Sequence, residues 1–143
     1  MNDPTSAPKW HVIAILIARL IFAGLFAMAA IFKFADTNGT AGYIAAVGFP
    51  FPLLLAWLAP FFEIPVVLCL LTGAYFTEAA LLAAVYVLFL AFAFHGPAQW
   101  KPDDPNEFGF FVDHFTFIAG LLFAAVHGPG SVLAVRKSIL GQR

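Results

Sequence analysis

The chain has 143 residues, of which 62% are hydrophobic and only 10% are charged. A soluble domain carries about 25% charged residues, so this composition predicts an integral membrane protein surrounded by lipid. The formal net charge of −1 supplies no basic surface, and we expect no nucleic-acid partner. A single cysteine, Cys69, excludes an internal disulfide and a cysteine-based zinc or iron–sulfur site.

Four segments are apolar and long enough to cross a bilayer, which takes about 20 residues of helix. The first two predicted spans cover about 10–34 and 53–75, and the last two cover about 77–95 and 110–127. The connection between the second and third spans is very short, so we expect those two to form an antiparallel hairpin. The sequence therefore predicts an all-α fold: a polytopic, antiparallel bundle of four transmembrane helices in a single domain, 1–143.

Two connections between the spans have a distinct composition. The stretch 41–47 is followed by Gly48, Pro50 and Pro52, which stop a helix, so it fits a short interfacial helix. The stretch 96–109 is the long polar loop of the sequence.

The distribution of lysine and arginine predicts the orientation. With four spans, both termini share a side, and that side carries more basic residues than the acid-rich opposite side. The positive-inside rule then places both termini in the cytoplasm, in a bacterial-type inner membrane. The basic residues are Lys9, Arg136, Lys137 and Arg143 on the terminal side, and Lys33 and Lys101 on the other.

Two charged residues, Arg19 and Glu63, lie deep in the predicted spans. A charge there costs roughly 2.5–3.5 kcal/mol on insertion scales. Their depths differ by about 5 Å at 1.5 Å of rise per residue, so we expect an Arg19–Glu63 ion pair between neighbouring helices. The pair either fixes the helix register or forms a polar site for a ligand, and intramembrane charge favours the second interpretation.

Further polar residues gather at the outer level. Lys33 shares a helix face with Arg19, with Ala23, Phe26 and Ala30 between them. An outer cluster is therefore expected, either as a site for a quinone headgroup, a metal or an anionic substrate, or as ordinary interfacial anchoring. Its members are Lys33, Asp36, His95, Trp100, Asp113 and His114, of which His95, Asp113 and His114 are the candidate metal ligands.

The histidine spacing argues against haem. His114 and His127 are 13 residues apart, which turns them about 140° from each other around a helix, and His11 lies at the very start of its span. We therefore do not expect a b-type dihaem bundle. No Cys-x-x-Cys-His motif is present, which excludes c-type haem attachment.

Several short motifs follow one another along the chain in a fixed order: Arg19-Leu-Ile-Phe with Gly24, Ala30-Ile-Phe-Lys33, Ala41-Gly-Tyr-Ile-Ala-Ala-Val-Gly-Phe-Pro50, Glu63, His95 and Gly128-Pro-Gly-Ser131. By their order and spacing, the chain resembles the DoxX family of small four-helix membrane proteins over roughly 15–133. The resemblance implies the four-span architecture and a subunit linked to quinone reduction during sulfur-compound oxidation, or a membrane partner of soluble redox or detoxifying proteins. It also implies recurrent polar positions at Arg19, Lys33, Glu63 and His95.

The first functional hypothesis is a quinone-associated subunit or partner of a redox system, with electrons supplied by another protein. The alternatives are a non-catalytic membrane scaffold for a partner protein, and a small transporter or channel with Glu63 on the path. A bundle of four short helices also leaves a homodimer open. The candidate ligand-binding residues are Arg19, Lys33, Glu63, His95, Trp100, Asp113 and His114.

Overall fold

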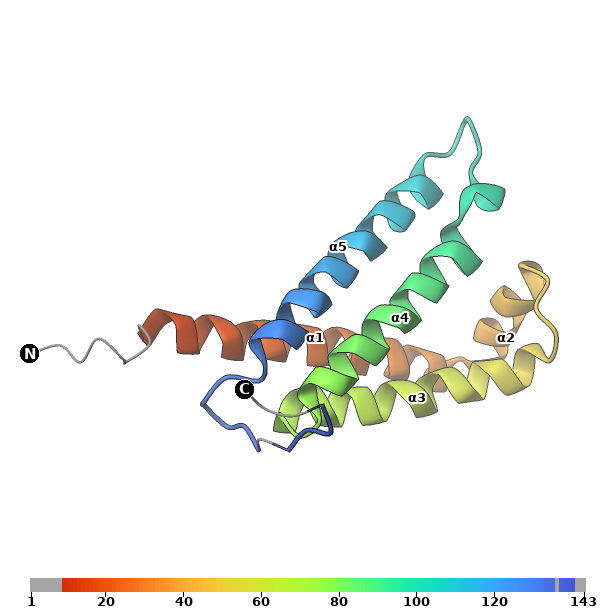
Figure 1. The fold of residues 1–143 in the computed structure, drawn as a ribbon. Coiled ribbons are helices and arrows are strands. Elements are labelled where there is room, and N and C mark those ends of the chain that lie inside the picture. The colour runs from red at the N-terminus through yellow and green to blue at the C-terminus, as the bar shows by residue number, and fades with distance from the viewer. Residues whose placement is uncertain (1–8, 136, 141–143) are drawn as a thin grey trace, which may run out of the picture.

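A computed structural model describes residues 9–135 and 137–140, which form helices joined by short connections (Figure 1). Four helices are long and apolar enough to cross a membrane, and no β-strand forms within the described residues. The prediction of an all-α, four-span membrane protein is confirmed. The elements are α1 (Lys9–Ala35), α2 (Thr37–Ala46), α3 (Pro52–Thr72), α4 (Phe76–His95), the short 3-10 helix η1 (Pro97–Gln99) and α5 (Asn106–His127).

The four long helices form two pairs. Helix α1 packs along α3, and α4 packs along α5. The pairs meet near the turn between α3 and α4 and diverge from it, with α2 beside the far end of α3 (Figure 1). The short α3–α4 turn was predicted correctly, and the two helices pack as the predicted hairpin from the turn to Glu63 and Tyr86, beyond which they diverge. The divergence leaves room for a cavity between them.

The α1–α3 interface follows the predicted face of α1. Arg19, Ala23, Phe26 and Ala30 are all buried, as their helical spacing predicts. The two alanines allow α3 to approach closely, because membrane helices without a hydrophobic driving force rely on tight packing. Helix α3 presents its own buried face to α1, formed by Ala56, Pro60, Glu63, Val66 and Leu70.

Small residues also allow the close contacts of α4 and α5. Gly120 of α5 lies against Phe22 of α1, where a Cβ atom would be only 2.7 Å from Cζ of the phenylalanine. The glycine therefore lets α5 cross α1. Leu121 and Ala125 are the buried residues of α5. On α4 the buried alanines are Ala79, Ala80, Ala83, Ala84 and Ala91.

Helix α2 bridges the open ends of the two pairs. Its N-cap is Asp36, whose carboxylate accepts a hydrogen bond of 2.8 Å from the backbone N–H of Gly39. The rings of Tyr43 and Phe49 stack on Phe94 of α4, with centroid distances of 5.4 and 5.8 Å. The short helix predicted here therefore exists, begins earlier than expected at Thr37, and links α3 to α4.

Two predicted helix boundaries are wrong. Helix α3 ends at Thr72 instead of residue 75, because Gly73 takes a positive φ of 75° that ends the helix. Helix α5 begins at Asn106 instead of residue 110, since Oδ1 of Asp104 accepts a hydrogen bond of 3.1 Å from the Asn106 N–H. The polar loop is correspondingly shorter.

After α5, the described residues 128–135 and 137–140 (the C-terminal segment) return across the α3–α4 turn. The Val135 N–H donates to the Thr72 carbonyl at 2.8 Å, and the Tyr75 N–H donates to the Lys137 carbonyl at 2.6 Å. The segment is thus pinned to the end of the molecule where the helix pairs meet. Oε1 of Glu78 on α4 accepts three more hydrogen bonds from it, donated by the Ser138 hydroxyl and the N–H groups of Ile139 and Leu140.

Candidate functional site

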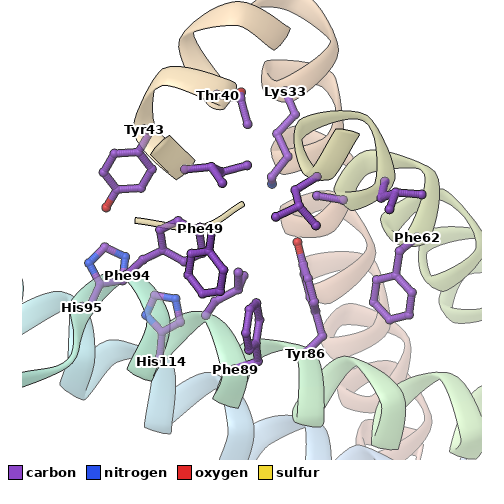
Figure 2. Close-up of a pocket in the computed structure, with 15 residues that line it drawn as sticks. Lys33, Thr40, Tyr43, Phe49, Phe62, Tyr86, Phe89, Phe94, His95 and His114 are labelled. Atoms are coloured by element: carbon purple, nitrogen blue, oxygen red, sulfur yellow. The ribbon is translucent and has the colours of Figure 1, made fainter. Parts of the chain in front are cut away.

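A cavity of about 350 Å³ lies between the two helix pairs, under α2 (Figure 2). Its walls are mostly aliphatic and aromatic side chains from α2, α3 and α4, and its polar groups lie in two separate places. The lining residues are Lys33, Thr40, Tyr43, Ile44, Phe49, Leu55, Leu58, Ala59, Phe62, Tyr86, Phe89, Leu90, Phe94, His95 and His114.

One set of polar residues, which we call the inner cluster, consists of Lys33, Glu63 and Tyr86. Lys33 was expected in the outer cluster. Nζ of Lys33 lies 2.8 Å from Oε1 of Glu63, and the Tyr86 hydroxyl donates to the same oxygen at 2.9 Å. Glu63 is only 1% exposed. Its second oxygen, Oε2, is buried without a hydrogen-bond partner among the described residues. The inner cluster therefore places an ion pair and a phenol beside the cavity, with acceptor capacity left over.

The predicted Arg19–Glu63 ion pair is wrong. Arg19 is 3% exposed, and its guanidinium donates to five backbone carbonyls instead of a carboxylate. Two belong to the last turn of α3, Leu70 at 3.1 Å and Leu71 at 2.7 Å, where helix carbonyls have no partner within the helix. The other three belong to the C-terminal segment: Pro129 at 2.9 Å, Val132 at 2.9 Å and Leu133 at 3.1 Å.

The direction of helical side chains explains the choice of partner. Along the antiparallel α1–α3 pair, Glu63 lies at a height between Arg19 and Lys33. Every Cα–Cβ bond in an α-helix tilts toward the helix N-terminus. Lys33 therefore leans back toward Glu63, whereas Arg19 leans away from it toward the end of α3. Because the prediction compared only Cα depths, it selected the wrong cation.

A second set of polar residues, which we call the outer pair, consists of His95 on α4 and His114 on α5. Their ring centroids are 5.0 Å apart, and both side chains line the cavity, so the two histidines lie within reach of one ligand as predicted. Nδ1 of His95 lies 2.7 Å from Oε2 of Glu107. Nδ1 of His114 lies 2.7 Å from the carbonyl oxygen of Phe110.

Tyr43 of α2 completes this end of the cavity. Figure 2 shows its hydroxyl on the side of the His95 ring. Burial, and then the nearby negative charge of Glu107, raise the pKa of Tyr43 above its ordinary value.

Three residues predicted for the outer cluster do not line the cavity. Asp113 is exposed on α5, and Asp36 caps α2. The indole N–H of Trp100 donates to the His95 carbonyl at 2.8 Å, which caps the end of α4. Among the described residues no group of three histidine, cysteine or acidic side chains is placed to hold a metal, so His95, Asp113 and His114 do not form the three-ligand site considered from sequence.

Sequence reasoning missed Tyr43, Tyr86 and Glu107 as site residues. Tyr86 carried a usable signal, because a phenol in the middle of an apolar span needs a hydrogen-bond partner. Glu107 carried none, because its role depends on α5 beginning early enough to bring it beside His95.

Comparison with known proteins agrees with this architecture. The chain matches the DoxX family over residues 14–96, from within α1 to the end of α4. It is also similar to inner membrane protein YphA of Escherichia coli (strain K12), at 28% identity over 127 residues that cover 87% of this chain and 90% of that protein. No solved structure matches the chain. Because the family match extends over more than half of the sequence and over three of the four spans, this membrane protein belongs to the DoxX family.

Proposed function

We propose that this DoxX-family protein binds a quinone in the cavity beneath α2 and serves as a quinone-associated subunit or partner of a redox system. The observation that carries the proposal is the cavity itself. Its volume of about 350 Å³ falls in the range of small-molecule sites, about 300–1,000 Å³, and such sites combine apolar walls with a few placed polar groups. In this proposal a partner protein supplies the electrons and the chain supplies the ligand site.

The residues present fit a quinone headgroup. An ammonium group has three donors, and Lys33 uses two of them, on Glu63 at 2.8 Å and on the Ala29 carbonyl at 3.4 Å. The third donor remains for a ligand carbonyl. Phe49 and Phe89, whose centroids are 5.8 Å apart, offer ring faces and edges to a flat ring between the two polar ends.

We also propose that the termini and the C-terminal segment face the cytoplasm. The support is the excess of basic residues on that side, of which Lys137 lies in the described part of the chain and Arg136 and Arg143 lie outside it. The outer pair of the cavity then lies toward the side of the membrane away from the cytoplasm, and the inner cluster lies nearer the middle of the membrane, because Glu63 and Tyr86 are central in α3 and α4.

Filling the cavity tests the binding proposal. Ala59 lines the cavity, so Ala59→Phe inserts a ring into the space that a quinone would occupy. We expect it to weaken binding of decylubiquinone by about tenfold or more, the equivalent of an overpacking cost of about 1–3 kcal/mol. Binding is measured in nanodiscs by quenching of tryptophan fluorescence.

The matched control is Ala18→Phe, which adds the same ring to an exposed position on α1. Its affinity for decylubiquinone should equal that of the unchanged protein. Equal affinities of all three proteins, or no saturable binding by the unchanged protein, contradict the proposed site.

A further inference from the structure

The hydrogen bonds of the two cavity histidines fix which nitrogen faces a ligand. A backbone carbonyl can only accept, so Nδ1 of His114 carries the hydrogen that it shares with the Phe110 oxygen. An ionised carboxylate can also only accept, so Nδ1 of His95 carries the hydrogen that it shares with Glu107. In both rings Nε2 is the nitrogen left for a ligand, and in a neutral imidazole Nε2 is an acceptor.

The two redox forms of a quinone differ in what they offer to such a nitrogen. A hydroquinone hydroxyl donates a hydrogen bond and suits a neutral Nε2. A quinone carbonyl only accepts, so it needs Nε2 to carry a proton. Imidazole changes charge between about pH 5 and 8, so either state is accessible.

His95 is the better placed of the two to take up that proton. The Glu107 carboxylate lies 2.7 Å from its Nδ1, so protonation at Nε2 creates an ion pair within the protein instead of an isolated charge. His114 has only a neutral carbonyl at its Nδ1. Glu107 thus acts through His95 as a positioning residue.

The other polar and charged groups around His95 do not replace the role of Glu107. Helix α5 contributes Glu107 and His114, α2 contributes Tyr43, and α1 contributes Lys33 at the opposite end of the cavity. The residues of α3 that line the cavity are all apolar: Leu55, Leu58, Ala59 and Phe62.

We infer that His95, backed by Glu107, makes the cavity a proton-linked site that distinguishes quinone from hydroquinone, so that quinone binds with uptake of one proton and hydroquinone without it. This inference rests on the proposed quinone site. Because one proton accompanies one ligand, quinone affinity falls as pH rises, while hydroquinone affinity does not fall.

The test compares decylubiquinone with decylubiquinol in nanodiscs at several values between pH 5.5 and 8, under anaerobic conditions. A hydrogen bond from a charged group contributes about 1.5–3 kcal/mol, so quinone affinity should drop by at least about tenfold across this range. Hydroquinone affinity should stay level or rise. This comparison uses the unchanged protein and does not depend on the folding of any variant.

Two variants test whether His95 and Glu107 cause the pH dependence of quinone binding. His95→Asn should remove the pH dependence of quinone binding, and Glu107→Gln should weaken quinone binding at the acid end of the range, because the protonated ring loses its carboxylate partner. The matched control is His127→Asn, because His127 makes the same kind of Nδ1 contact to a carbonyl, that of Phe123 at 3.1 Å, but lies at the other end of α5. It should leave the pH dependence unchanged.

The outcomes separate this inference from the proposed function. If both probes bind with the same pH profile, or if His95→Asn retains the quinone profile, the proton linkage is wrong and the quinone site stands. If neither probe binds saturably at any pH, the proposed function itself is wrong and this inference falls with it.

Discussion

Lys33 and Glu63 form an ion pair of 2.8 Å between α1 and α3, and the carboxylate oxygen involved also accepts a hydrogen bond from Tyr86 of α4. The contact ties three helices together at the point where the two helix pairs diverge. Because Glu63 is fully enclosed, the pair matters for stability as well as for the chemistry of the cavity.

Replacing one partner of the Lys33–Glu63 pair should destabilise the protein strongly, and replacing both should destabilise it less than the two single losses together. We expect Lys33→Leu and Glu63→Leu each to lower the free energy of unfolding by about 3–5 kcal/mol, because each strands the other charge in a low-dielectric site. The double variant should lose clearly less than the sum of the two. Unfolding in mixed detergent micelles measures all four proteins, and strictly additive losses contradict the pairing.

The Tyr86 hydroxyl should contribute to stability separately from the Lys33–Glu63 ion pair. Tyr86→Phe removes a hydrogen bond to a charged acceptor and should lower the free energy of unfolding by about 1.5–3 kcal/mol. Tyr75→Phe is the matched control, since Tyr75 is 42% exposed. It should change stability by less than about 0.5 kcal/mol. Equal effects of the two substitutions would show that the Tyr86 hydrogen bond does not stabilise the protein.

The hydrogen bonds of Arg19 should hold the C-terminal segment in place. Arg19→Lys keeps the charge but replaces a guanidinium that reaches five carbonyls with a single ammonium. In a Cys69→Ala background, we expect it to raise the labelling rate of a cysteine placed at Ser131, because the segment loses three of its anchors at Pro129, Val132 and Leu133.

The control for Arg19→Lys is the same cysteine in the otherwise unchanged chain, together with a cysteine at Asp103 at the far end of the molecule. The labelling rate at Asp103 should not respond to the substitution. An unchanged rate at Ser131 contradicts this role of Arg19.

Topology is tested by cysteine labelling from outside the cell. With Cys69→Ala as background, an impermeant maleimide should modify a cysteine at Asp103 but not one at Ser6, because we expect both termini in the cytoplasm. The reverse pattern would invert the proposed orientation.

Much of the fold was predictable because lipid imposes simple rules on the sequence. The length of apolar segments gave the four spans, and helical spacing gave the buried face of α1 through Arg19, Ala23 and Ala30. The boundaries at Thr72 and Asn106 were missed, because they depend on a positive φ at Gly73 and on the hydrogen bond from the Asn106 N–H to the Asp104 side chain.

The site was only partly predictable. Lys33, Glu63, His95 and His114 were all named from sequence, and the structure brings them to one cavity or against its wall. The partner of Glu63 was wrong because depth along a helix ignores the direction in which a side chain leans. The acceptors of Arg19 were not predictable, since they are backbone carbonyls whose positions depend on how the C-terminal segment returns to α3.

Photo-crosslinking with an azidoquinone, followed by peptide mapping, shows directly whether the cavity beneath α2 holds a quinone. We expect labelling of lining residues on α2 and α4, such as Tyr43, Phe89 and Phe94, that excess decylubiquinone suppresses. Labelling confined to exposed, lipid-facing positions such as Phe123 and Val126, or labelling that excess decylubiquinone leaves unchanged, would contradict the proposed quinone site.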